Sequence, residues 1–249
     1  MSMDIPIGDL AYNCFAKLGK SGKPNPESEY TVLAAIVCER KDCDNKSIGR
    51  QVVALTTGTK CQPSNWSSKQ HLIVDSHAES LLKRAFKRYL ISQLENGLKV
   101  DNLDISLFIS QLPCGSLQRW KGDPNYGLND TQTDRKPGRG EPCHKPTCLK
   151  KIAKWIYLGL QGKRLIECTK DPIYINNIVI GNCGQIGEYD EQMIKDLLAL
   201  DANCVSHNPF KLDFLPQIKF CKDFRNDLFI KCNEKQSAPT ALVMWLTGI

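Results

Sequence analysis

The sequence lacks any long hydrophobic run, because no window approaches the roughly 18 consecutive apolar residues that a membrane-spanning helix requires. Its first 20 residues lack the basic start and unbroken apolar stretch of a secretory signal peptide. We therefore expect no membrane association and no secretion. Histidine is also scarce, with four in 249 residues. A histidine that stands two positions before a glutamate, as in His77-Ala78-Glu79, is then worth explaining.

Cysteine, by contrast, is abundant, with 12 in the chain. Most of these cysteines stand singly in apolar segments rather than at the spacings of a small disulfide-bonded domain. We interpret them as reduced thiols, so that individual cysteines are available for a chemical role. The hydrophobic content of 41% suits one large folded domain. A net charge of +6 favours a polyanionic partner without identifying it.

Hydrophobic periodicity predicts an alternation of helices and strands. Apolar residues recur at helical spacing in four segments, namely 7–18, 77–97, 148–165 and 190–200. Runs rich in β-branched residues predict strands at 30–39, 50–58, 104–113, 173–181, 217–222, 228–232 and 240–248. The stretch between them at 114–147 is rich in Gly, Pro and Asn and is expected to form functional loops. Alternating elements of this kind predict an α/β sandwich.

The His77-Ala78-Glu79 triplet precedes the most periodic helical segment. Residues two apart face different sides of a regular helix, so both side chains can serve one site only where the chain enters the helix. At that point the helix dipole favours a nearby anion such as hydroxide or a thiolate. The triplet therefore indicates a site at the start of this helix.

A thiol follows the next predicted strand in Pro-Cys-Gly, at Cys114. Zinc-dependent nucleobase deaminases combine H-x-E with P-C-x-x-C, in which one histidine and two cysteines bind zinc and the glutamate transfers protons. The second cysteine of that signature is missing here, because position 117 is Leu117. From the residues alone, either Cys143 or Cys148 is near enough in the chain to be the third ligand.

Four stretches in order, "DSHAES", "LPCG", "KPGRG" and "TCLKKIAKWIYLGLQG", resemble the motifs of the adenosine deaminases that act on RNA. The early "GKPNPESEYTVLAAIV" and "TTGTKC" are more similar to the tRNA-specific branch of that family. The resemblance runs from about residue 7 to 247 and implies a cytidine-deaminase-like three-layer α/β/α sandwich around a mixed β-sheet. We expect residues 1–249 to form a single deaminase (editase) domain without a double-stranded-RNA-binding domain. Because the family continues beyond the last predicted strand, we expect this domain to be truncated at its C-terminus.

The resemblance also implies a reaction and a set of metal ligands. Cys148 matches the family's second thiolate, so His77, Cys114 and Cys148 are expected to hold Zn²⁺, with Cys143 as the alternative third ligand. Glu79 is expected to carry protons while water replaces the amino group of adenine. The implied activity is that of a hydrolase that converts adenosine to inosine in tRNA at position 37, next to the anticodon of an alanine tRNA.

Residues outside this cluster are matched to binding roles. Thr59 and Lys60 match contacts to the sugar and phosphate of the target nucleotide, and Arg139 matches the residue that fills the space left by the flipped base. The family also buries inositol hexakisphosphate. The residues matched to that second cofactor are Lys83, Arg84, Lys151, Lys154 and Trp155.

Asp75 and Lys151 match a relay between the inositol phosphate and the metal. The expected partner is a tRNA, with no obligate protein partner, and the expected location is the cytoplasm, the nucleus or both. Two alternatives stay open: deamination of other RNA adenosines, and an inactive homologue that binds RNA or zinc.

Overall fold

A six-stranded mixed sheet runs through the computed structural model, with strand order β10-β3-β2-β6-β7-β8. The structure describes residues 5–42, 44, 47–62, 73–97, 103–115, 145–181, 216–221, 236–238 and 240–246. The strands are β2 (Leu33–Lys41), β3 (Ser47–Thr57), β6 (Leu103–Ile109), β7 (Asn177–Ile180), β8 (Gln217–Phe220) and β10 (Val243–Trp245). Pairing is antiparallel from β10 through β6 and parallel from β6 through β8. The sheet is therefore mixed, as predicted.

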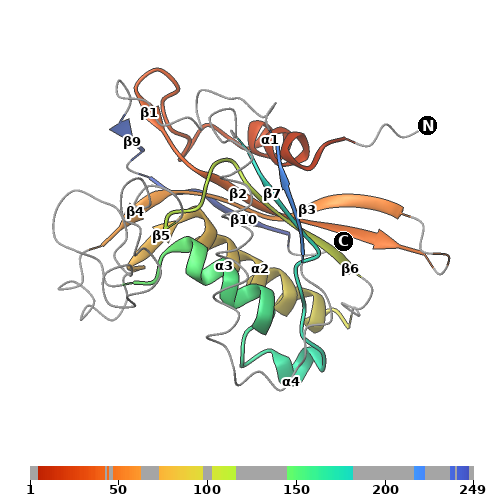
Figure 1. The fold of residues 1–249 in the computed structure, drawn as a ribbon. Helices are drawn as coiled ribbons and strands as arrows, with labels where there is room; N and C mark the ends of the chain where they lie inside the picture. The colour runs from red at the N-terminus through yellow and green to blue at the C-terminus, as the bar shows by residue number, and fades with distance from the viewer. Residues whose placement is uncertain are drawn as a thin grey trace.

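Helices cover both faces of this sheet (Figure 1). The helices are α1 (Ile7–Lys17), α2 (Ala78–Glu95), α3 (Cys148–Leu158) and α4 (Ile166–Thr169). Successive residues of a strand point to opposite faces, and β2 divides its apolar residues accordingly. Ala34 and Ile36 pack with α2 and α3, whereas Leu33 and Ala35 pack with α1. The α/β/α arrangement predicted from the sequence is thus confirmed.

Two helical predictions are confirmed almost to the residue, since α1 and α2 lie within 7–18 and 77–97. The helix predicted at 148–165 is too long, because α3 ends at Leu158. Gly159 follows with a φ of 78°, a left-handed conformation that glycine tolerates, and its N–H bonds to the Trp155 carbonyl. The chain then turns into the separate short helix α4.

Several strands, including β8 (Gln217–Phe220) against a prediction of 217–222, are shorter than their apolar runs predicted. β6 ends at Ile109, β7 begins at Asn177, and β10 is confined to Val243–Trp245. Sheet pairing rather than apolar content sets these limits, because only residues with a neighbouring strand complete the ladder. The predicted helix at 190–200 and the predicted strand at 228–232 lie outside the described residues.

Two short strand pairs were not predicted. β1 (Glu29–Tyr30) pairs with β9 (Gln236–Ser237), and β4 (Thr59–Cys61) pairs with β5 (Asp75–His77). β5 leads directly into α2, so this pairing fixes where the histidine enters the helix. None of the helices in the described part of the chain has the length and apolarity needed to cross a membrane.

Candidate metal centre

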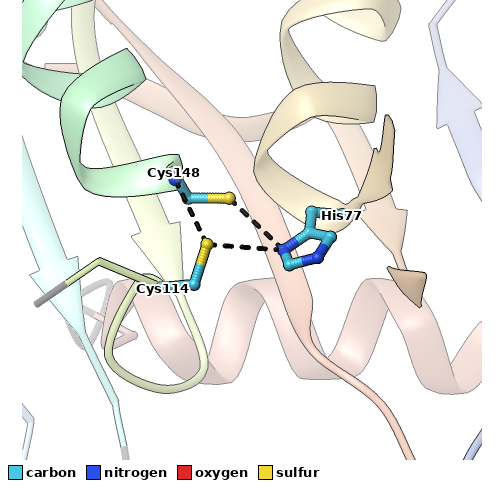
Figure 2. Close-up of side chains that lie close together, drawn as sticks. All are labelled: His77, Cys114 and Cys148. Atoms are coloured by element: carbon cyan, nitrogen blue, oxygen red, sulfur yellow. Dashed lines mark hydrogen bonds between the residues drawn. The ribbon is translucent and has the colours of Figure 1, made fainter. Parts of the chain in front are cut away.

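One imidazole and two thiols meet at the start of α2 (Figure 2). His77 Nδ1 lies 3.5 Å from the Sγ of Cys148 and 3.7 Å from the Sγ of Cys114. Zinc in a tetrahedral site binds nitrogen at about 2.0 Å and sulfur at about 2.3 Å, which places such ligand atoms about 3.5 Å apart. The donor set and its spacing fit Zn²⁺, with three protein ligands and a fourth position left for water or substrate.

Each of the three side chains comes from the end of a different element. His77 is the last residue of β5 and the N-cap of α2, Cys114 lies in the turn after β6, and Cys148 is the first residue of α3. His77 and Cys148 are buried, and Cys114 is half-buried. Residues at the ends of helices and strands can point their side chains past a helix terminus, which is what the sequence predicts for His77.

The Cys114 turn packs against the N-terminus of α3. The backbone N–H of Cys148 donates to Cys114 Sγ at 3.2 Å, and the N–H of Leu149 donates to the Cys114 carbonyl at 3.0 Å. Thr147 caps the same helix by accepting from the Lys150 N–H. Free N–H groups and the helix dipole both stabilise a thiolate, the form of cysteine that binds metal.

Glu79 lies in the first turn of α2, two residues beyond the histidine, and its side chain is 3% exposed. A carboxylate this deeply buried is uncommon without a charged or polar partner, and Glu79 does take part in such an interaction. Burial at this position keeps bulk water from competing for its protons. Its role as a proton carrier stays a prediction.

The structure brings the predicted relay pair together. Lys151 Nζ on α3 contacts Asp75 Oδ2 on β5, and Asp75 Oδ1 accepts from the backbone N–H of His77 at 3.1 Å. Ser80 was not singled out in the sequence, yet its hydroxyl donates to Asp75 Oδ2 and accepts from Lys151 Nζ, both at 2.8 Å. This ion pair ties α3 to the strand that carries His77.

A second basic group joins α2 to α3. Lys83 Nζ lies over the Trp155 ring, 5.1 Å from its centroid. Burial, together with the nearby charges of Lys87 and Lys154, lowers the pKa of Lys83 to about 7. Arg84 is exposed on α2, and no contact within the described part of the chain ties it to this group. No ion pair joins Lys83 to a carboxylate among the residues that the structure describes.

Among the predicted nucleotide contacts, Thr59 lies directly across from His77 in the β4–β5 pair. The Thr59 hydroxyl and His77 Nε2 are both buried and make no hydrogen bond to the residues that the structure describes. Lys60 is exposed on β4. Arg139 and the alternative ligand Cys143 lie outside the described residues.

Comparisons with known proteins agree on one family. A family described as "Adenosine-deaminase (editase) domain" matches residues 54–125, a range that contains His77, Glu79 and Cys114. The tRNA-specific adenosine deaminase 1 of Drosophila melanogaster is 26% identical over 95% of this chain and 69% of its own length. The tRNA-specific adenosine deaminase 1 of Homo sapiens is 34% identical over 44% of this chain and 27% of its own length.

A further relative, the double-stranded RNA-specific editase B2 of Mus musculus, is 28% identical over 64% of this chain and 28% of its own length. The chain thus spans between about a quarter and two thirds of these curated relatives.

Among solved structures, the Rib2 deaminase of Aspergillus oryzae (a C-terminal deletion mutant) aligns over 76% of both chains, with a TM-score of 0.33 and 14% identity. The same deaminase in complex with DARIPP aligns over 77% of this chain and 97% of that chain, with a TM-score of 0.34. At these TM-scores the fold rests on the sheet order and the helix layers described above. The editase match over residues 54–125 and the curated relatives lead to one conclusion: the chain is similar to adenosine deaminases of the editase family in the segment that carries His77, Glu79 and Cys114.

Proposed function

We propose that this chain is a zinc-dependent hydrolase that deaminates adenosine to inosine in tRNA. The observation that carries the proposal is the meeting of His77, Cys114 and Cys148 at the start of α2, the helix whose first turn holds the buried Glu79. Three of these four residues lie inside the editase match. A buried imidazole and two thiols have little structural use at a helix N-terminus, whereas a metal with one open position explains all three.

The residues divide the chemistry as follows. Bound zinc would supply the Lewis-acid activation that allows water to attack C6 of adenine at neutral pH. Glu79 takes a proton from the attacking water and then delivers protons to the ring nitrogen and to the departing amine. Adenosine and water are thereby converted to inosine and ammonia, with no redox step. Asp75 holds the backbone N–H of His77, so the relay pair positions the imidazole.

The relatives that carry "tRNA-specific" in their names support a tRNA as substrate. We place the target at position 37, next to the anticodon of an alanine tRNA. The adenine must leave its stack to reach a buried site, at a cost of a few kcal/mol. Thr59 and Lys60 would contact the flipped nucleotide, and Arg139 would occupy the vacated space. Such a substrate places the protein in the cytoplasm, the nucleus or both.

We also propose that inositol hexakisphosphate binds between α2 and α3. The half-buried Lys83, which lies over Trp155 near Lys154 and whose pKa is lowered, supports this assignment, because a polyanion there would supply a counter-charge. Lys151 would connect it to Asp75 and so to the metal centre.

A second candidate substrate is another RNA adenosine, which the resemblance to double-stranded RNA editases favours. The test incubates zinc-loaded protein with an alanine tRNA transcript, total tRNA and an RNA duplex, and sequences each for A-to-G changes. Glu79→Gln keeps the size of the side chain and removes its proton-carrying carboxylate, and Glu167→Gln on α4 is the matched exposed control.

We expect inosine beside the anticodon for the wild type and for Glu167→Gln, and a loss of roughly 10²-fold or more for Glu79→Gln. Inosine in the duplex alone would select the second candidate. A folded protein that retains zinc and forms no inosine in any of the three RNAs would reject the activity and leave an inactive zinc-binding or RNA-binding homologue.

A further inference from the structure

A cavity of about 330 Å³ lies at the other end of the sheet from the metal centre. Its lining comes from β2, β3 and α2 and includes Cys38, Arg40, Gly49, Gln51, Val53 and Tyr89. Tyr89 lies 12 residues along α2 from His77, or about 18 Å at 1.5 Å per residue. The end of the sheet where β2 leads into β3 lies on the opposite side of the molecule from the β4–β5 pair in Figure 1. This cavity, called here the β2–β3 cavity, therefore has no part in the deamination site.

Gly49 leaves one position of the cavity lining without a side chain. Gly49 pairs with Arg40, and Gln51 pairs with Cys38, across the two strands. Paired residues in an antiparallel ladder project to the same face, here the face that Cys38 shares with α2. A Cβ built on Gly49 would meet nothing within 4 Å, and the φ of Gly49 is not in the left-handed region. The backbone does not require glycine at this position, yet a larger residue would fill the space opposite Arg40.

The cavity combines one unbalanced positive charge with an apolar floor. Nearby charges cancel in pairs, because Arg50 contacts Glu39 at 3.0 Å and Lys41 contacts Asp104 at 3.0 Å. Arg40 is exposed and has no carboxylate partner among the residues that the structure describes, and its side chain hydrogen-bonds to the Tyr89 hydroxyl.

The floor of the cavity adds no negative charge. Cys38 is buried, and burial raises its pKa to about 12, so the thiol is neutral. Val53 and the Tyr89 ring supply apolar surface beside it.

We propose that the β2–β3 cavity binds a small organic anion with one acidic group and an apolar ring. The planar fork of Arg40 matches a carboxylate or phosphate, and the Gln51 amide offers a further hydrogen bond. The ring lies against Val53 and Tyr89. The volume falls at the lower end of the range of small-molecule sites, which suits a single ring rather than an oligonucleotide.

The test is a protein-observed NMR titration of the whole chain with phenyl phosphate and with benzoate. Inorganic phosphate and phenol serve as probes of the acidic group and the ring alone. Arg40→Gln removes the charge, Gly49→Leu fills the hollow without backbone strain, and Arg164→Gln on an exposed turn is a matched charge control. Thermal unfolding establishes that each variant is folded, and Arg40→Gln decides the result if Gly49→Leu is not.

We expect saturable binding of at least one ring anion, with phosphate and phenol each weaker. Affinity should fall about tenfold or more in Arg40→Gln, the cost of one lost charge-assisted hydrogen bond, and should vanish in Gly49→Leu. The Arg164→Gln control should bind as the wild type does. The stronger of the two ring anions identifies the acidic group as phosphate or carboxylate.

Absence of saturable binding would overturn the proposal, and so would equal affinity in wild type, Arg40→Gln and Gly49→Leu. Binding should persist in Glu79→Gln, so this outcome is independent of the deaminase proposal.

Discussion

At the scale of single residues, Lys83 departs strongly from its solution behaviour. Its amine is surrounded by the Trp155 ring and by the positive charges of Lys87 and Lys154, and burial is the largest cause of its lowered pKa. The ordinary value near 10.5 applies to the unfolded chain, whereas the folded value is about 7. Between these two values the unfolded state binds one more proton than the folded state, so folding becomes more favourable as pH rises.

We expect the free energy of unfolding of the wild type, measured in urea, to increase from pH 7 to pH 9 relative to Lys83→Met. The slope for a single proton cannot exceed about 1.4 kcal/mol per pH unit. Adding inositol hexakisphosphate should flatten this dependence, because a polyanion favours the charged lysine.

Lys163→Met is the control for this measurement, because Lys163 is exposed and its loss should leave the pH dependence intact. Parallel pH profiles for the wild type and Lys83→Met would show that Lys83 is charged throughout this range in the folded protein.

At the scale of elements, the metal centre depends on how closely the Cys114 turn approaches α3. Gly115 has a φ of 96°, and a Cβ at this position would lie 2.3 Å from Thr147 Oγ1, the atom that caps α3. Glycine is required here for two reasons, namely the backbone conformation and the close contact. The same approach allows the Cys148 N–H to reach Cys114 Sγ.

Gly115→Ala should therefore displace the Cys114 turn and lower both stability and zinc affinity. We expect a loss of stability of about 1–3 kcal/mol in chemical unfolding and a weaker hold on zinc in a chelator competition.

Gly97→Ala separates the two causes of this effect, because Gly97 has a φ of 68° at the end of α2 with nothing within 4 Å of an added Cβ. It should cost stability through backbone strain and leave zinc affinity unchanged. Equal zinc affinity in both variants would contradict the role given to the Gly115 contact.

At the scale of the whole molecule, the proposed metal is a cross-link. Its three ligands are 37 and 34 residues apart in the sequence and belong to the ends of β5, β6 and α3. A ligand that binds only the folded state adds its binding free energy to stability. Bound zinc would therefore hold the ends of β5, β6 and α3 together.

Removing zinc with a chelator should lower the midpoint of thermal unfolding by roughly 5–10 °C, which corresponds to about 2.7 kcal/mol at a hundredfold excess of metal over Kd. Cys148→Ser should reproduce this loss and reduce the zinc content measured by mass spectrometry. Cys168→Ser, an exposed cysteine on α4, should retain both stability and zinc. Full zinc content in Cys148→Ser would shift the third ligand to another residue, with Cys143 first in line.

Local pattern was sufficient for the elements that carry the site. The apolar stripe of α2 was enough to predict the helix, and the His77-Ala78-Glu79 triplet was enough to predict that a site lies at its start. Local sequence pattern was not enough to predict strands whose pairing partners are distant in the chain. The β4–β5 pair orients His77. Each of its two strands has three residues, which is too short to show the alternating apolar pattern of a strand.

The sequence by itself determined the donor types, the order in which they occur and the helix that presents them, because these depend on residue identity and on short-range periodicity. Tertiary structure alone decided that Cys148 Sγ lies 3.5 Å from His77, that Ser80 joins Asp75 to Lys151, and that the sheet leaves a hollow opposite Arg40. Each of these contacts joins segments that only sheet pairing and helix packing bring together. No local pattern encodes them, because the free energy that fixes them comes from burial across the whole fold.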